Sequence, residues 1–113
     1  MPEDSSMTFA MNYFRNIDNE RSLLADMYSD TGRLSWAGKM ITGSREIGRF
    51  LKELPSTIHK ISGVTCVVEG QVLLVSVFGR LIMDDSEMGF HRSFRLTKEV
   101  NDSKIVHDYY RPQ

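Results

Sequence analysis

Residues 71–83 read QVLLVSVFGRLIM, and this stretch decides the fold. Its β-branched content and flanking turns favour a strand over a helix, and side chains alternate across a strand. One face carries only apolar residues and glycine: Leu73, Val75, Val77, Gly79, Leu81 and Met83. The other face is also mostly apolar: Val72, Leu74, Ser76, Phe78, Arg80 and Ile82. A sheet with one solvated side has polar residues at alternate positions. We therefore expect the chain's own helices to cover one face and a partner the other.

Length, composition and charge limit the classes of protein to which the chain can belong. The chain has 113 residues, which suits a single domain with one core, and 41% hydrophobic with 26% charged residues argues against disorder. A net charge of −1 predicts no direct binding of nucleic acid and no membrane partner. The single cysteine, Cys66, excludes an internal disulfide and is expected to be a small buried hydrophobe. No apolar run approaches the roughly 20 residues that span a bilayer, and the acidic start MPEDSS is unlike a signal peptide, so we expect a soluble intracellular protein.

Hydrophobic spacing and turn residues predict the order of elements. We expect a flexible polar tail over residues 1–6 and one domain over residues 7–113. Helices are predicted from residue 7 to 17, from 18 or 19 to 28, and from 44 to 54, with a turn at 29–32. Strands are predicted at 33–36, 39–42, 58–69, 71–83, 88–100 and 104–111, with turns at 84–87 and 101–103. Helices followed by antiparallel strands indicate an α+β fold with the helices on one face of a bent sheet.

Residues with catalytic or metal-binding potential are few. The histidines His59, His91 and His107 lie on three different predicted strands and match no metal motif, so we interpret them as surface or interface residues. His107 and Asp108 are adjacent on a strand, point to opposite faces and cannot form a dyad. Trp36, at the end of the first strand, either fills the core or lines a ligand pocket. We expect no cofactor and no metal.

Several motifs occur in the order of a known family. The segments YF (13–14), IDNERSLLADMY (17–28), LSWAG (34–38), GSREIGRFLKELP (43–55), MGFHRSF (88–94) and HDYYRPQ (107–113) resemble the nuclear transport factor 2-like superfamily over nearly the whole chain. The resemblance implies a cone in which three helices pack on a strongly bent antiparallel sheet. It also implies dimers that pair through the outer face of that sheet. This agrees with the two apolar faces of residues 71–83.

Two non-enzymatic branches of the superfamily fit best. Residues 54–66, LPSTIHKISGVTC, and the ending YYRPQ are similar to the small subunit of the mRNA export receptor heterodimer, although Pro112 departs from that ending. This branch implies a heterodimer with the large receptor subunit, indirect contact with nucleoporins, and shuttling between nucleus, nuclear pore and cytoplasm. MGFH, DNER and the acidic turn resemble the homodimeric carrier of GDP-bound Ran instead. That branch has a glutamate where this chain has Ala37, and its acidic turn is one residue longer, so we favour the export subunit.

The expected interface lies on the outer sheet face. It comprises the residues that we call the outer patch: Val72, Leu74, Ser76, Phe78, His91, Ser93, Arg95, His107, Tyr109 and Arg111. The resemblance implies that Arg111 pairs with an aspartate of the large subunit.

Enzymes of the superfamily, such as relatives of ketosteroid isomerase and scytalone dehydratase, place acid–base residues inside the cone instead. Alternation points Val106, Asp108 and Tyr110 inward on the last strand, so Trp36, Asp108 and Tyr110 are the candidates for a cone pocket. Non-catalytic relatives share the Asp-aromatic-aromatic-Arg ending. We therefore expect no catalytic residue.

Overall fold

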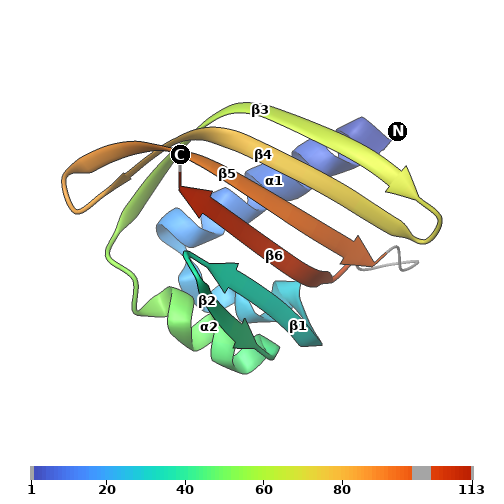
Figure 1. The fold of residues 1–113 in the computed structure, drawn as a ribbon, viewed down its shortest axis with the longest axis horizontal. Helices are drawn as coiled ribbons and strands as arrows, with labels where there is room; N and C mark the ends of the chain where they lie inside the picture. The colour runs from blue at the N-terminus through green and yellow to red at the C-terminus, as the bar shows by residue number, and fades with distance from the viewer. Residues whose placement is uncertain (1, 98–102, 113) are drawn as a thin grey trace.

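The structure is a computed structural model that describes residues 2–97 and 103–112. It contains one six-stranded sheet in the order β2-β1-β6-β5-β4-β3, and α1 runs diagonally across one face of it (Figure 1). Neighbouring strands are antiparallel except β1 and β6, which run parallel. The α+β cone fold is therefore confirmed, with one parallel pair in place of a wholly antiparallel sheet.

The elements follow one another along the chain in this order: α1 (Pro2–Asn19), the short 3₁₀ helices η1 (Arg21–Leu23) and η2 (Ala25–Met27), β1 (Tyr28–Trp36), β2 (Lys39–Thr42), α2 (Ser44–Lys52), β3 (Thr57–Glu69), β4 (Val72–Met83), β5 (Ser86–Thr97) and β6 (Ile105–Pro112). The predicted end of the fifth strand at 98–100 lies outside the described residues, as does most of the turn at 101–103.

The two α-helices form because their apolar residues recur at helical spacing. In α1 the buried apolar residues are Ala10, Tyr13, Phe14 and Ile17, and in α2 the buried residues are Ile47, Gly48 and Leu51. Positions i, i+3, i+4 and i+7 share one helix face, which packs on the sheet. The helix α1 begins at Pro2, so residues 2–6, which we expected to be a tail, form its first turns. Proline suits that position because the first helical N–H has no acceptor within the helix.

The segment after α1 differs from the predicted second helix. Residues 21–27 form two single 3₁₀ turns, and Tyr28 already belongs to β1. The predicted turn at 29–32 is also wrong, because these residues lie within β1, where the pairing with β6 shifts register between Tyr28 and Arg33. A Cβ on Gly32 would lie 2.9 Å from the Ile105 carbonyl oxygen. This close approach of two backbones draws the segment into the sheet, and local sequence preference does not reveal it.

The long strands β3, β4 and β5 follow the predicted alternation. Val75, Val77 and Leu81 of β4 are buried against the helices, and the pairing of β3 with β4 shifts register between Ile61 and Gly63. On β6 one expectation is wrong. Ile105 is fully buried while Val106 is only half-buried, because a register shift near Leu96 changes which residues face inward at the start of this strand.

Candidate functional site

A buried ion pair occupies the interior of the cone. Arg92 of β5 donates from Nε to Asp108 Oδ1 at 2.7 Å and from Nη2 to Asp108 Oδ2 at 2.8 Å. Both residues are 0% exposed. They come together because Phe94, two positions after Arg92 on the same face of β5, pairs in register with Asp108 of β6. A two-point guanidinium–carboxylate contact of this kind is strong and directional.

Two tyrosines complete the cluster around this pair. Tyr28 Oη donates to Asp108 Oδ2 at 2.5 Å, Tyr13 Oη donates to the same oxygen at 3.2 Å, and Arg92 Nη2 donates to Tyr13 Oη at 2.7 Å. Burial raises the pKa of both tyrosine hydroxyls. Burial would lower the pKa of Arg92, but the adjacent Asp108 carboxylate outweighs it and the net shift is upward. The tyrosines therefore stay neutral and Arg92 stays charged.

Aromatic rings surround the Arg92 guanidinium. Its Cζ lies 5.1 Å from the ring centres of Tyr13 and Trp36, 5.5 Å from Phe94 and 5.9 Å from Tyr110. Trp36 and Tyr110 stack on each other with their centres 4.2 Å apart. Trp36, Asp108 and Tyr110, the candidates for a cone pocket, are buried inside the cone, and the Arg92 guanidinium lies beside all three.

Arg92 was not among the site residues predicted from the sequence, although its position carried a signal. In MGFHRSF, alternation points Phe90, Arg92 and Phe94 to the same side, so an arginine is predicted inside a core face. An arginine is almost never fully buried without a partner, which would have directed attention to Asp108. Tyr13 and Tyr28 carried no such signal, because a tyrosine on an apolar face is ordinary.

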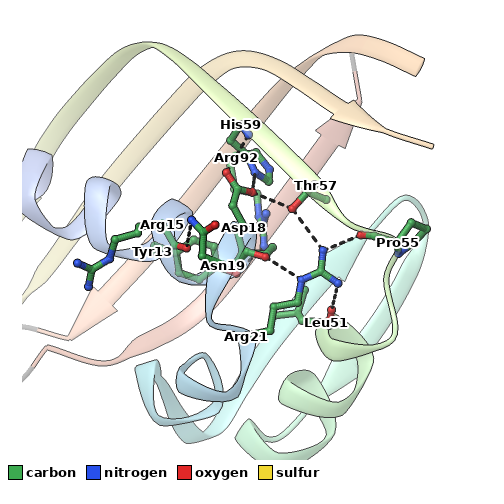
Figure 2. Close-up of polar contacts among 11 residues, drawn as sticks. Tyr13, Arg15, Asp18, Asn19, Arg21, Leu51, Pro55, Thr57, His59 and Arg92 are labelled. Carbon is green, nitrogen blue, oxygen red and sulfur yellow. Dashed lines mark hydrogen bonds and ion pairs between the residues drawn. The ribbon is translucent and has the colours of Figure 1, made fainter. Parts of the chain in front are cut away.

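A second polar cluster joins the ends of the helices to β3 (Figure 2). The His59 side chain is 1% exposed and pairs through Nδ1 with Asp18 Oδ1 at 2.7 Å. Its backbone N–H also donates to Asp18 Oδ2 at 2.9 Å, and Thr57 Oγ1 donates to Asp18 Oδ1 at 2.7 Å. The expectation that His59 is a surface or interface histidine is wrong, because the end of α1 covers this part of β3.

Arg21 binds the carboxyl ends of both α-helices. Its Nε donates to the Ile17 carbonyl oxygen at 2.7 Å, Nη1 donates to the carbonyl oxygens of Leu51 and Leu54, and Nη2 donates to that of Pro55 at 2.6 Å. The last carbonyl oxygens of a helix receive no hydrogen bond from an N–H of the same helix, and they carry partial negative charge. Arg21 therefore satisfies two helix ends at once and fixes α2 against α1.

The outer patch lies on the opposite face of the sheet from α1. The pairing places nine of its ten members in three rows across β4, β5 and β6: Leu74, Arg95 and His107; Ser76, Ser93 and Tyr109; Phe78, His91 and Arg111. The tenth, Val72, pairs with Thr97. Phe78 is 46% exposed and Tyr109 is 39% exposed, which is unusual for large side chains in the middle of a sheet. A hollow of about 270 Å³ lies between β4, β5 and β6 and is lined by members of all three rows.

Charges in the outer patch have one sign. It contains Arg95, Arg111 and two histidines, and the exposed Arg33 of β1 pairs in register with His107. Arg111 lies over the Tyr109 ring at 4.7 Å, and His107 Nε2 is 3.2 Å from Ser35 Oγ. Within the described strands β4, β5 and β6, the carboxylate on the outer face is that of Glu87, and it already pairs with Lys60 and Arg80 at the end of the sheet. The arginines of the outer patch form no ion pair with a carboxylate of the described residues.

Other kinds of site find no support. Among residues 2–97 and 103–112, no group of three or more His, Cys, Asp or Glu side chains is placed to hold a metal ion. None of the described helices has the length and apolar character needed to cross a membrane.

A family model for the nuclear transport factor 2 (NTF2) domain matches residues 5–111. The chain belongs to the NTF2 domain family. Nuclear transport factor 2 of Dictyostelium discoideum is 28% identical over 109 residues, covering 91% of this chain and 86% of the relative. The NTF2-related export protein of Caenorhabditis elegans is 30% identical over 118 residues, covering 96% of this chain and 85% of the relative.

Solved structures of NTF2-like proteins have the same fold. Nuclear transport factor 2 of Cryptosporidium parvum superposes with a TM-score of 0.89 at 20% identity and covers 98% of this chain and 94% of its own. The yeast UBP3-associated protein BRE5 gives a TM-score of 0.82 at 20% identity over 95% of this chain and 92% of its own. These similarities confirm the cone fold that the sequence motifs predicted.

Proposed function

We propose that this chain is a non-enzymatic scaffold subunit that heterodimerises, through the outer patch, with the related domain of a large mRNA export receptor. In this role it would stabilise the receptor domain, contact nucleoporins only indirectly, and support export of poly(A) RNA through the nuclear pore. It would therefore shuttle between nucleus and cytoplasm. The relatives named NTF2-related export protein support this assignment. The observation that carries it is the outer patch, in which exposed aromatic and arginine side chains form no ion pair with a carboxylate of the described residues.

Charge favours a different partner over a second copy. In a two-fold homodimer the same patch faces itself, so a residue of one protomer meets some other residue of the same patch on its partner. Here Arg95 and Arg111 would face a patch that contains arginines and no acidic residue, and like charges across an interface are unfavourable. A related sheet face that presents carboxylates would pair with them instead. An area on the order of 800 Å² per partner would be typical of such a contact.

The alternative is a homodimeric carrier of GDP-bound Ran, which relatives named nuclear transport factor 2 support. This alternative lacks one group that the resemblance associates with Ran binding, because Ala37 stands where that branch has glutamate. Ala37 is exposed at the β1–β2 turn. The charge of the outer patch also opposes self-pairing.

A cone-fold isomerase or dehydratase is the third possibility, and the hydrogen bonding inside the cone argues against it. A general base needs a free oxygen beside a bound substrate. The oxygens of Asp108 accept hydrogen bonds from Arg92, Tyr13 and Tyr28, and Arg92 takes up the adjoining space. The cluster therefore favours a structural role for Asp108.

Light scattering coupled to size exclusion tests the proposal. The chain is expected to form no stable homodimer alone and to form a 1:1 complex with the NTF2-like domain of an export receptor. A calorimetric titration with Ran·GDP should show no binding at micromolar concentrations. The Ala37→Glu variant should change the affinity for Ran·GDP only if the rest of the Ran-binding site is present. A stable homodimer that binds Ran·GDP would overturn the proposal in favour of the carrier.

A further inference from the structure

A groove on the helical side of the molecule is not used by the proposed function. It has a volume of about 580 Å³ and runs between α2 on one side and η1 and η2 on the other. Its floor consists of Gly48 and Ala25, where a Cβ on Gly48 would lie 2.8 Å from Ala25 Cβ. These small residues let α2 pack closely against η2 beneath the groove. The sheet separates this groove from the outer patch.

Basic residues form one wall of the groove. Arg45, Arg49 and Lys52 of α2 line it and are exposed. Their spacing of four and then three residues places them along one helix face, opposite the buried Ile47 and Leu51. Arg49 makes only a loose contact with Glu46, at 3.7 Å, and both side chains are more than half exposed. Such a surface pair contributes little, so Arg49 remains able to bind another carboxylate.

The other residues of the groove leave an excess of positive charge. Arg21 lines it too, but its nitrogens are engaged by carbonyl oxygens at the helix ends. Asp26 and Glu53 supply two carboxylates against the four basic residues. Ser22 and Ser44 add hydroxyl groups that can donate or accept hydrogen bonds.

We propose that this groove binds an acidic, extended segment of a partner protein. Arg45 and Arg49 are separated by about 6 Å along the helix axis, at 1.5 Å per residue. Alternate side chains of an extended peptide recur at about 6.6 Å, so a Glu-x-Glu segment matches this pair of arginines. Arginine suits the task because its planar guanidinium binds a carboxylate at two points.

The lining disfavours single-stranded RNA as the ligand. Proteins bind unpaired bases largely by stacking them on aromatic rings. The groove is lined by no aromatic residue among those described. A single phosphate ion would use one or two of the basic residues and leave most of the groove unfilled. A peptide carrying several carboxylates would use the whole wall.

Fluorescence anisotropy with a fluorescein-labelled peptide of alternating Glu and Ser tests this proposal on the full chain. Binding is expected to weaken as salt rises, and Arg49→Glu is expected to weaken it about tenfold, because one attraction becomes a repulsion. Amide chemical-shift changes should concentrate at Ser22, Ala25, Gly48 and Arg49. Ser22→Trp should weaken binding as well, because it fills the groove without changing the charge.

Arg15→Glu is the matched control, because it changes the net charge equally. Arg15 is exposed on α1 and points away from Arg21 (Figure 2). It should alter peptide affinity by no more than about twofold. Equal weakening by Arg15→Glu and Arg49→Glu, or shift changes centred on the outer patch, would overturn the proposal. So would an oligouridylate that binds more tightly than the peptide and is lost with Arg49→Glu. Heterodimer formation should be unaffected by Arg49→Glu, which separates this test from that of the proposed function.

Discussion

Arg92 and Arg111 are arginines on adjacent strands of one sheet, and their surroundings are opposite. Arg92 lies inside the cone, pairs with Asp108 through two hydrogen bonds, and has aromatic rings around it. Arg111 lies on the outer patch, over the ring of its own neighbour Tyr109, and has no carboxylate among the described residues. The same residue types therefore form a closed cluster on one face and an open one on the other.

This difference implies that the inner cluster serves the stability of the chain and the outer patch the recognition of a partner. A buried arginine requires a partner in the same chain, because an unpaired charge without water costs several kcal/mol. An exposed arginine beside an exposed tyrosine carries no such requirement in the isolated chain. Tyrosine and arginine are also the residues that most often dominate binding energy at interfaces. The inner cluster should thus respond to mutation in folding experiments, and the outer patch in binding experiments.

Removing the inner carboxylate should have the largest effect. Asp108→Ala leaves Arg92 buried and alone and should lower the free energy of unfolding by about 3–5 kcal/mol. Chemical denaturation of the purified chain measures this. Tyr109→Ala is the control, because the adjacent residue faces outward and should cost less than about 1 kcal/mol. Equal losses in the two variants would remove the distinction between the faces.

Reversing the outer charge should abolish binding without unfolding the chain. Arg111→Glu is expected to weaken the complex with the export receptor domain by about 2–5 kcal/mol, because a desolvated pair becomes a repulsion. Complex formation and circular dichroism are measured on the same protein, with Arg15→Glu as the control for net charge. Intact binding by a folded Arg111→Glu variant would place Arg111 outside the interface.

Two phenylalanines test the same contrast between the inner and outer faces, with smaller expected effects. Phe50 of α2 is half-buried, with its ring 5.8 Å from that of Trp36, whereas Phe78 lies on the outer patch. Phe50→Ala should cost about 2 kcal/mol of stability, less than the roughly 3–5 kcal/mol of a fully buried phenylalanine. Phe78→Ala should cost less than about 1 kcal/mol and should instead weaken the complex. A loss below about 1 kcal/mol for Phe50→Ala would contradict packing of α2 over the cone interior.

The smallest expected effect is on the pH dependence of the free energy of unfolding, to which His59 should contribute more than His107. Burial lowers the pKa of His59 below its ordinary value of 6.5, and the Asp18 carboxylate offsets this only in part. Below about that pH the unfolded chain binds a proton that the native state does not, so the free energy of unfolding falls as pH falls. His59→Phe should remove part of this decline. His107, whose pKa is lowered by burial and by Arg33, should contribute less because its ring is more exposed. An equal change in His107→Gln would contradict the distinction.

The family and the main elements were predictable from sequence. The helices α1 and α2 and the two faces of β4 follow from periodic apolar residues, because burial of one helix or strand face is recorded locally in the sequence. The outer patch was also predictable, since alternation along β4, β5 and β6 selects its members. Their role in binding a partner stays a prediction.

Only the tertiary structure decided which polar groups meet. Tyr28 and Tyr13 are 80 and 95 residues from Asp108, and His59 is 41 residues from Asp18. Local periodicity shows that such residues lie inside but not which of them become neighbours, because that depends on strand order and register. The parallel pairing of β1 with β6 likewise turned a predicted helix and turn into 3₁₀ turns and strand. Local patterns therefore specify most of the elements and their faces, whereas the packing of distant strands brings the buried Arg92 cluster together inside the cone.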